Sequence, residues 1–82
     1  MPTHLVISKG TELLRVPLNS LMYISADGNY SIVVTKDSHK TLMSIQLGQI
    51  EALMAKQLGS SGNVFIRAGR GLIINTDYIN YI

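Results

Sequence analysis

FIRAGRGLIIN, residues Phe65 to Asn75, joins two short apolar runs through a loop of three small residues and one arginine. Both runs are expected to be strands, because β-branched and aromatic residues fit a pleated, half-buried surface. Glycines at positions 69 and 71 give the backbone access to positive φ and let it approach a partner closely. The sequence therefore predicts a loop that holds the Arg70 guanidinium out between two anchored strands, with an ordinary solvated hairpin end as the alternative.

Length and composition limit what the chain can be. With 82 residues, of which 46% are hydrophobic and 15% charged, we expect one folded domain over residues 1–82. The net charge of +2 is too small on its own to indicate nucleic acid as a partner. No apolar run approaches the roughly 18 residues of a membrane span, and the N-terminus lacks an export signal. We therefore expect a cytoplasmic protein without a membrane partner.

Catalytic and metal-binding hypotheses find little support. The chain has no cysteine, and neither His4 nor His39 has an Asp, Glu or Cys at ligand spacing, so no metal site is expected. Asp37, Ser38 and His39 are residue types of a hydrolytic triad, but neighbours on one turn cannot form a site that several elements must build. The GRG sequence lacks the Lys and Ser/Thr of a nucleotide-binding loop. We therefore expect no enzyme, no cofactor and no small-molecule substrate.

Apolar runs separated by polar turns predict most of the remaining structure. The sequence Asp27-Gly28-Asn29 favours a tight hairpin turn, because these residues supply positive φ angles. Pro17 ends strand pairing and favours one helical turn. The expected strands are Leu5–Ile7, Leu13–Val16, Leu21–Ile24, Tyr30–Thr35 and Thr41–Met43. The last three of these would form a meander.

One segment of the chain has a helical period. Its apolar positions repeat at threes and fours and are Leu47, Ile50, Leu53 or Met54, and Leu58. This period predicts an amphipathic helix over residues 45–58, capped by Ser44 and ended by Gly59 as a left-handed residue. The apolar stripe is interpreted as core packing, and a dimer seam is the alternative. Residues 59–63 are expected to be a flexible link.

The segment FIRAGRGLIINTDYI resembles the signature of LytTR-type DNA-binding domains, the output modules of a class of bacterial response regulators. In that family an aromatic residue, an arginine, a short loop, an apolar run and an asparagine followed by an isoleucine recur in this order. The positions in register here are Phe65, Arg67, Arg70, Leu72 to Ile74, Asn75 and Ile79. Upstream, Tyr23-Ile24, Asp27 to Tyr30 and the helical segment follow the family's order, so the resemblance covers roughly residues 13–79.

The resemblance implies both a fold and a way of binding. The fold would be mainly β with one α-helix, built from elongated antiparallel β-sheets, with the C-terminal part shortened because the family continues into further strands beyond Ile82. Such a module binds double-stranded DNA with loops that project from its sheets. The family's contacts correspond here to Asn29 and Ser31, around one turn, and to the loop of Arg70. A third contact loop of the family would lie beyond Ile82.

Two positions of the Arg70 loop depart from the family pattern. Gly69 and Gly71 stand where the family usually has His and Ser, which removes a side-chain hydrogen bond on each side. The backbone amides of Gly69 and Gly71 can still donate to phosphate. Arg70 can pair bidentately with guanine O6 and N7, for roughly 1–3 kcal/mol of discrimination.

Three further cations are candidates for phosphate contacts. Arg67 is taken to alternate with Phe65 and is therefore expected to face away from the core, with simple solvation as the alternative. Lys36 and Lys40 flank a polar turn, where lysine is also common for solubility. None of the three has a specific signal beyond its charge.

Two classes of function remain open. The favoured hypothesis is a bacterial transcriptional regulator of a two-component system, which binds specific DNA sequences as a homodimer because one small module buries little surface. The alternative is a degenerate LytTR-like protein-interaction or dimerisation module without DNA recognition. Salt separates the two, since binding by phosphate neutralisation weakens as salt rises whereas an apolar interface barely responds.

Overall fold

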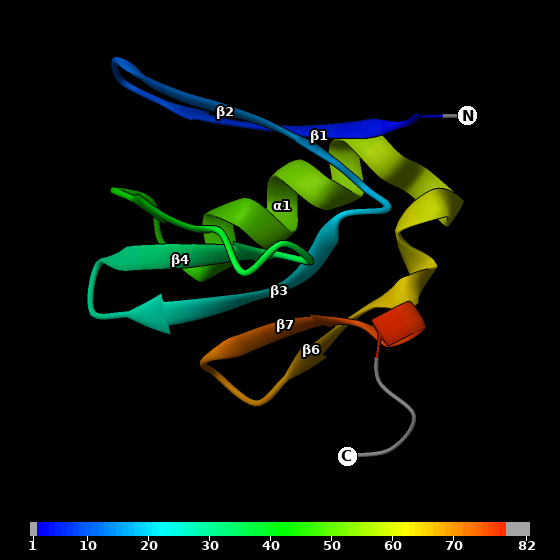
Figure 1. Cartoon of the computed structure of the whole chain (residues 1–82). Coiled ribbons are helices and arrows are strands. Elements are labelled where there is room, and N and C mark those ends of the chain that lie inside the picture. The colour runs from blue at the N-terminus through cyan, green and yellow to red at the C-terminus, as the bar shows by residue number, and fades with distance from the viewer. Residues whose placement is uncertain (1, 79–82) are drawn as a thin grey trace.

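The computed structural model describes residues 2–78 (Figure 1). Along the chain, the strands and helices are β1 (His4–Lys9), β2 (Glu12–Pro17), β3 (Leu21–Asp27), β4 (Tyr30–Thr35), β5 (Lys40–Met43), α1 (Leu47–Leu58), the 3-10 helix η1 (Gly59–Val64), β6 (Phe65–Ala68), β7 (Leu72–Asn75) and the 3-10 helix η2 (Thr76–Tyr78). Paired strands are antiparallel throughout. They form a two-stranded sheet, β1-β2, and a five-stranded sheet with the order β5-β4-β3-β7-β6, called the large sheet below. The expected class, mainly β with one α-helix in the described part of the chain, is confirmed.

Helix α1 lies between the β1-β2 hairpin and the large sheet and supplies the centre of the core (Figure 1). Its buried side chains are Leu47, Ile50, Met54 and Leu58. Leu5 and Ile7 meet them from β1, and Ile24 and Val33 meet them from the large sheet. Full burial of one such aliphatic side chain contributes about 1.5–3 kcal/mol. The apolar stripe of the helix therefore packs in the core, as predicted.

Strand alternation gives the large sheet two different faces. Ile24 lies opposite Val33 on one neighbouring strand and opposite Ile73 on the other, and all three belong to the core around α1. Because successive side chains point to opposite faces, the next residues along each strand form an outer face. Its apolar members include Tyr23, Ile32, Val34, Leu42, Ile66, Leu72 and Ile74. No strand or helix within residues 2–78 covers this face (Figure 1).

The predicted cap of the helix is wrong. Ser44 donates its backbone amide and its hydroxyl to the Glu12 carboxylate, at 2.8 and 3.0 Å. The residue that caps α1 is Gln46, which forms a reciprocal capping box with Gln49. Ser44 is unavailable to the helix because a carboxylate on β2 takes both of its donors.

The segment after the helix also differs from the prediction. Gly59 has a positive φ of 54°, but its ψ of −130° lies outside the left-handed helical region. The residues that follow form η1 instead of a flexible link. Gly62 packs closely on the helix end, where an added Cβ would lie 3.3 Å from the Leu58 Cβ. Residues 59–64 are therefore a structured connection between α1 and β6.

Gln57 fastens α1 to the open edge of β1. Its Oε1 accepts a hydrogen bond from the Val6 amide at 2.9 Å, and its Nε2 donates to the Val6 carbonyl at 2.7 Å. Strand β2 pairs on the other side of β1. The side-chain amide thus satisfies the two backbone groups that Val6 directs away from β2.

Candidate nucleic-acid interface

The two predicted contact loops lie at the same end of the large sheet (Figure 1). Strands β3 and β7 pair antiparallel with Ser25 opposite Leu72, so the turn after β3 and the loop before β7 emerge side by side. The Ala26 amide donates to the Gly71 carbonyl at 2.8 Å and ties the loop to β3. We call this end, made of residues 27–30, 46–49 and 68–71, the Arg70 end.

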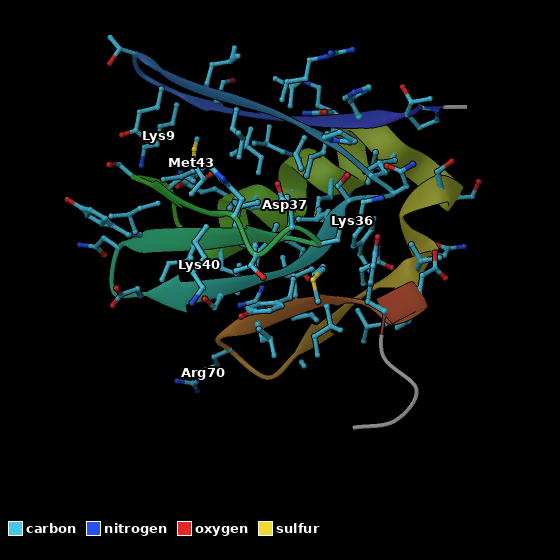
Figure 2. The ribbon with its side chains drawn as sticks, in the orientation of Figure 1. Lys9, Lys36, Asp37, Lys40, Met43 and Arg70 are labelled. Atoms are coloured by element: carbon cyan, nitrogen blue, oxygen red, sulfur yellow. The ribbon has the colours of Figure 1, made fainter. Side chains whose placement is uncertain are left out.

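Arg70 stands at the tip of the β6-β7 loop, and its side chain points away from the body of the molecule (Figure 2). The residue is exposed, and no hydrogen bond or ion pair to its guanidinium is found within residues 2–78. Gly69 has a φ of +66°, the conformation that glycine adopts at least cost. Gly71 has no positive φ, so only one of the two glycines uses the freedom that the sequence suggested.

Arg67 does not face away from the core, so this prediction is wrong. Residues two apart in a strand point to the same face, so Arg67 shares the face of Phe65, which packs against the core. Its guanidinium lies against α1, with Nη1 2.9 Å from Oε1 of Glu51. The guanidinium expected to face solvent thus forms an ion pair with another side chain of the protein.

The remaining donors of Arg67 bind the carbonyl groups of the loop. Nε donates to the Gly69 carbonyl at 3.1 Å, and Nη2 donates to the Arg70 carbonyl at 2.9 Å. The next carbonyl, of Gly71, accepts from Ala26. Three consecutive carbonyl groups of the loop are therefore satisfied within the protein.

This arrangement fixes the direction of two backbone amides. No peptide bond in the described residues is cis, and in a planar trans peptide the N–H points opposite to the C=O. The carbonyls of Gly69 and Arg70 point at the Arg67 guanidinium, so the amides of Arg70 and Gly71 point away from it. The backbone amides of Arg70 and Gly71 are therefore both oriented so that they can donate to an anion.

Asn29 lies exposed in the β3-β4 turn, beside the start of α1. Its Oδ1 accepts a hydrogen bond from Gln46 Nε2 at 3.1 Å. The backbone amide of Gln46 donates to Gln49 Oε1 at 3.2 Å, and this oxygen also lies 3.4 Å from Lys9 Nζ. A polar chain therefore runs from the β1-β2 hairpin through the first turn of α1 to the β3-β4 turn.

Ser31 is a correction to the predicted interface. Its exposed fraction is 0%, and its hydroxyl donates to the Ile45 carbonyl at 2.7 Å. Ser31 lies opposite Met43 and faces the core, so the chain that leads into α1 covers it. The side chain fastens β4 to that segment and has no surface with which to contact DNA.

The turn between β4 and β5 lies at the other end of the large sheet, called the Lys36 end (Figure 2). Here Asp37 accepts hydrogen bonds from the Thr35 hydroxyl and from the His39 amide. The Thr35 hydrogen bond is the main reason that the pKa of the Asp37 carboxyl lies below its ordinary value. Lys36 and Lys40 are exposed beside this turn. Lys36 directly follows β4 and Lys40 lies opposite Val34, whereas the Arg70 loop lies beside Ala26, which pairs with Ser31 near the start of β4.

Two residues that help to hold the Arg70 end, Glu51 and Gln46, were not predicted from the sequence. Glu51 lies off the apolar stripe of the predicted helix, and nothing in the sequence pairs it with a residue 16 positions later. Gln46 was likewise not identified as a partner of Asn29. A signal for Arg67 did exist, since its spacing of two from Phe65 already implied a shared face.

Comparisons with known proteins agree with this architecture. The family model described as the LytTr DNA-binding domain matches residues 11–82. Among solved structures, the LytTr DNA-binding domain of a protein described as a methyl-accepting/DNA response regulator from Bacillus cereus superposes with a TM-score of 0.69 and 22% sequence identity. That match covers 100% of this chain and 69% of the other. No curated protein matches the chain.

Residues 2–78 contain neither a metal-binding cluster nor a membrane-spanning helix. No three His, Cys, Asp or Glu side chains gather there in a way that could hold a metal ion. None of the helices in this part of the chain has the length and apolar character needed to cross a membrane. Ile79, the final signature position, lies outside the described residues.

Proposed function

Because the chain belongs to the LytTr DNA-binding domain family, we propose that it recognises a specific sequence of double-stranded DNA with the loops of the Arg70 end. The family match supports DNA as the partner. The location and the residues of the contact surface are our inference from the geometry of the Arg70 end. In this proposal, no helix enters the major groove, and contact is made by the β6-β7 loop and the β3-β4 turn.

The single observation that carries the proposal is the placement of Arg70. It is an exposed arginine without a partner in the described residues, on a loop whose three carbonyl groups are all bound within the protein. A guanidinium in this position can pair with O6 and N7 of guanine, and such a bidentate contact discriminates against other bases by about 1–3 kcal/mol. The amides of Arg70 and Gly71 are directed suitably for a neighbouring phosphate oxygen.

Asn29 would supply the second contact of the proposed surface. Its Oδ1 is engaged by Gln46, while its Nδ2 has no acceptor among residues 2–78. An amide nitrogen in an exposed turn can donate to a phosphate or to a base edge. Arg70 and Asn29 would then touch neighbouring positions of one binding site.

The proposal extends to the role and the place of the protein. We expect the domain to act as a transcriptional regulator of a two-component system in the bacterial cytoplasm, where the chromosome is accessible. Its small size argues that it binds as a pair, because one module of this kind buries only about 600–1,000 Å² against DNA.

A second copy could pack on the outer face of the large sheet. Leu42 is 57% exposed there, and Ile66 is 47% exposed. Five strands spaced about 4.8 Å apart make this face roughly 24 Å wide, so a second copy that packs on it would cover both exposed residues. Leu42→Asp and Ile66→Asp should lower the mass measured by light scattering. Leu13→Asp, at a residue of β2 that is 70% exposed, is the matched control that should not.

Replacement of Arg70 tests DNA recognition directly. The first step is selection of bound duplexes from a random pool, followed by titration of the preferred duplex in a mobility-shift series. Arg70→Ala should weaken binding to it by about 1–3 kcal/mol and relax the preference at one base pair. Lys36→Ala is the control, since it removes an equal charge at the other end of the sheet. Equal affinity of the Arg70→Ala variant and the parent chain would contradict the proposal.

One alternative has a specific observation in its favour. The outer face, on which Leu42 and Ile66 are exposed, would also suit a module that binds a protein and no longer contacts DNA. Affinity for DNA should fall steeply with salt, with a slope of about −0.9 per phosphate contact, whereas an apolar interface should not respond. Absence of any salt-dependent binding to duplex DNA would favour the interaction module.

A further inference from the structure

We propose that Arg67 is a positioning residue, which together with Glu51 holds the Arg70 loop in its DNA-binding conformation and does not itself touch DNA. This inference rests on the proposed function of Arg70. It concerns a different residue, Arg67, which acts on DNA binding only through the loop that it holds. Two observations and one physical argument support it.

The first observation is that one side chain binds the loop at two consecutive carbonyls. Nε of Arg67 reaches the Gly69 carbonyl, and Nη2 reaches the Arg70 carbonyl, at 3.1 and 2.9 Å. The guanidinium is a rigid planar fork, so these two contacts together set the orientation of both peptide planes. An ammonium group is a point charge and cannot reproduce this pair of bonds at a fixed spacing.

The second observation is that the fork itself is held from behind. Nη1 lies 2.9 Å from the Glu51 carboxylate on α1, which orients the guanidinium toward the loop. The two side chains are 30% and 51% exposed, so the ion pair alone adds little to stability. The ion pair matters for orientation, because through Arg67 it connects α1 to a loop whose residues other than Arg70 are small.

The third support is a physical argument about what the loop would present without Arg67. Glycine at positions 69 and 71 allows the intervening peptide groups to rotate with little steric penalty. Rotation of either peptide would turn a carbonyl oxygen outward in place of an N–H. A carbonyl oxygen repels a phosphate, whereas an amide attracts it, so the orientation enforced by Arg67 determines whether the loop accepts an anion.

The experiment measures affinity for the duplex selected from the random pool, over a series of salt concentrations. The variants are Arg67→Ala, Arg67→Lys, Arg70→Ala and the double variant Arg67→Ala/Arg70→Ala in the 82-residue chain. Arg67→Ala should weaken binding roughly fivefold, the cost of ordering a mobile loop when it binds. Its salt slope should equal that of the parent chain, because no cationic contact with a phosphate is removed. Arg67→Lys should bind as weakly as Arg67→Ala.

The double variant tests whether Arg67 acts through the loop that carries Arg70. If it does, Arg67→Ala should weaken binding much less when Arg70 is already alanine, so the two losses are not additive. Glu51→Gln keeps both loop carbonyl bonds and should weaken binding less than Arg67→Ala does. This variant also keeps the test available if Arg67→Ala fails to fold, which thermal unfolding would reveal.

Outcomes that overturn this inference differ from those that overturn the proposed function. If Arg70→Ala binds as well as the parent chain, the proposed function fails. If Arg70→Ala weakens binding but Arg67→Ala does not, the positioning role fails alone. The positioning role also fails if Arg67→Ala lowers the salt slope by about 0.9 and Arg67→Lys restores it, because Arg67 would then contact a phosphate directly.

Discussion

The two ends of the large sheet both carry a short turn with cationic residues, but side chains of opposite charge organise them. At the Lys36 end the Asp37 carboxylate accepts from the Thr35 hydroxyl and the His39 amide. At the Arg70 end the Arg67 guanidinium donates to the carbonyls of the loop. A carboxylate at the centre of a turn binds backbone N–H groups. A guanidinium binds backbone carbonyl groups instead, and the N–H groups of the same peptides then point outward. The charge of the organising residue therefore decides which turn is suited to an anion.

The same two turns use one unusual backbone angle with different residues. Ser38 at the Lys36 end and Gly69 at the Arg70 end both have a φ of 66°. Each end also has one buried polar side chain that pins it to the core. Asn75 serves the Lys36 end and Ser31 serves the Arg70 end. These pairs of residues allow each end to be perturbed separately.

The largest effect is expected at the pin of the Lys36 end. Asn75 is 2% exposed, donates to the Leu21 carbonyl at 2.8 Å and accepts from the Asp77 amide at 2.9 Å. Asn75→Ala should lower the free energy of unfolding by about 2–3 kcal/mol, because buried backbone groups lose their partners. Urea denaturation measures this loss. The affinity of the folded fraction for DNA should not change, since the Arg70 end is untouched.

A matched control for Asn75 is available on the next residue. Thr76 donates from its hydroxyl to the Val64 carbonyl at 2.8 Å, in an exposed environment. Thr76→Ala should therefore cost clearly less than Asn75→Ala. Equal losses for the two variants would show that burial of the Asn75 amide is not what stabilises this end.

The corresponding change at the Arg70 end should be smaller. Ser31→Ala removes a single buried hydrogen bond and leaves the Ile45 carbonyl unpaired, for a loss of about 1–2 kcal/mol in unfolding free energy. DNA affinity of the folded protein should stay the same, because the hydroxyl has no exposed surface. Weaker DNA binding of Ser31→Ala at unchanged stability would show that Ser31 contacts DNA and does not serve to fasten the Arg70 end to the core.

Exchange of the residues with positive φ should give effects of opposite sign. Gly69→Ala should destabilise by about 1 kcal/mol through backbone strain alone, since an added Cβ would meet nothing within 4 Å. Ser38→Gly should have a smaller effect, a gain of up to about 0.5 kcal/mol, because relief of strain is partly offset by the freedom glycine gains when unfolded. Thermal unfolding of the two variants measures both changes in stability. A loss in Ser38→Gly would show that the serine side chain outweighs the strain.

The smallest effect concerns pH. The pKa of the Asp37 carboxyl is lowered in the folded protein by its hydrogen bonds, so the ionised form stabilises the turn above the ordinary value of 3.8. This contribution is lost as pH falls through the lowered pKa. Asp37→Asn should remove this pH dependence, so that the difference in melting temperature from the parent chain narrows below about pH 3.8. A difference that stays constant with pH would contradict the assignment.

Local patterns predicted the strands and hairpins well, because period-two apolar runs and Asp-Gly turns report on neighbours in sequence. The expected strand Tyr30–Thr35 matches β4 as observed. The helix was also identified, but its start was not. The cap failed because Ser44 is bound by Glu12, a contact between residues 32 positions apart that no local pattern contains.

The predicted site was less complete for two distinct reasons. Ser31 was carried over from a family resemblance, which gives a position in the chain but not the burial of its side chain. Arg67 was placed on the wrong face although its spacing from Phe65 was sufficient to place it correctly. Its partner Glu51 could not be predicted, since that contact depends on how α1 crosses β6. The exposure of Arg70 was anticipated from its flanking glycines.

The Gln57 side chain has a consequence for how the protein avoids unwanted association. A strand at the margin of a sheet invites foreign chains to add on and extend it, which is a route to aggregation. On β1 the glutamine amide occupies the Val6 amide and carbonyl as a neighbouring peptide group would. A newcomer would have to displace it before it could extend the hairpin there. The Gln57 side chain thus protects this edge of the two-stranded hairpin against polymerisation.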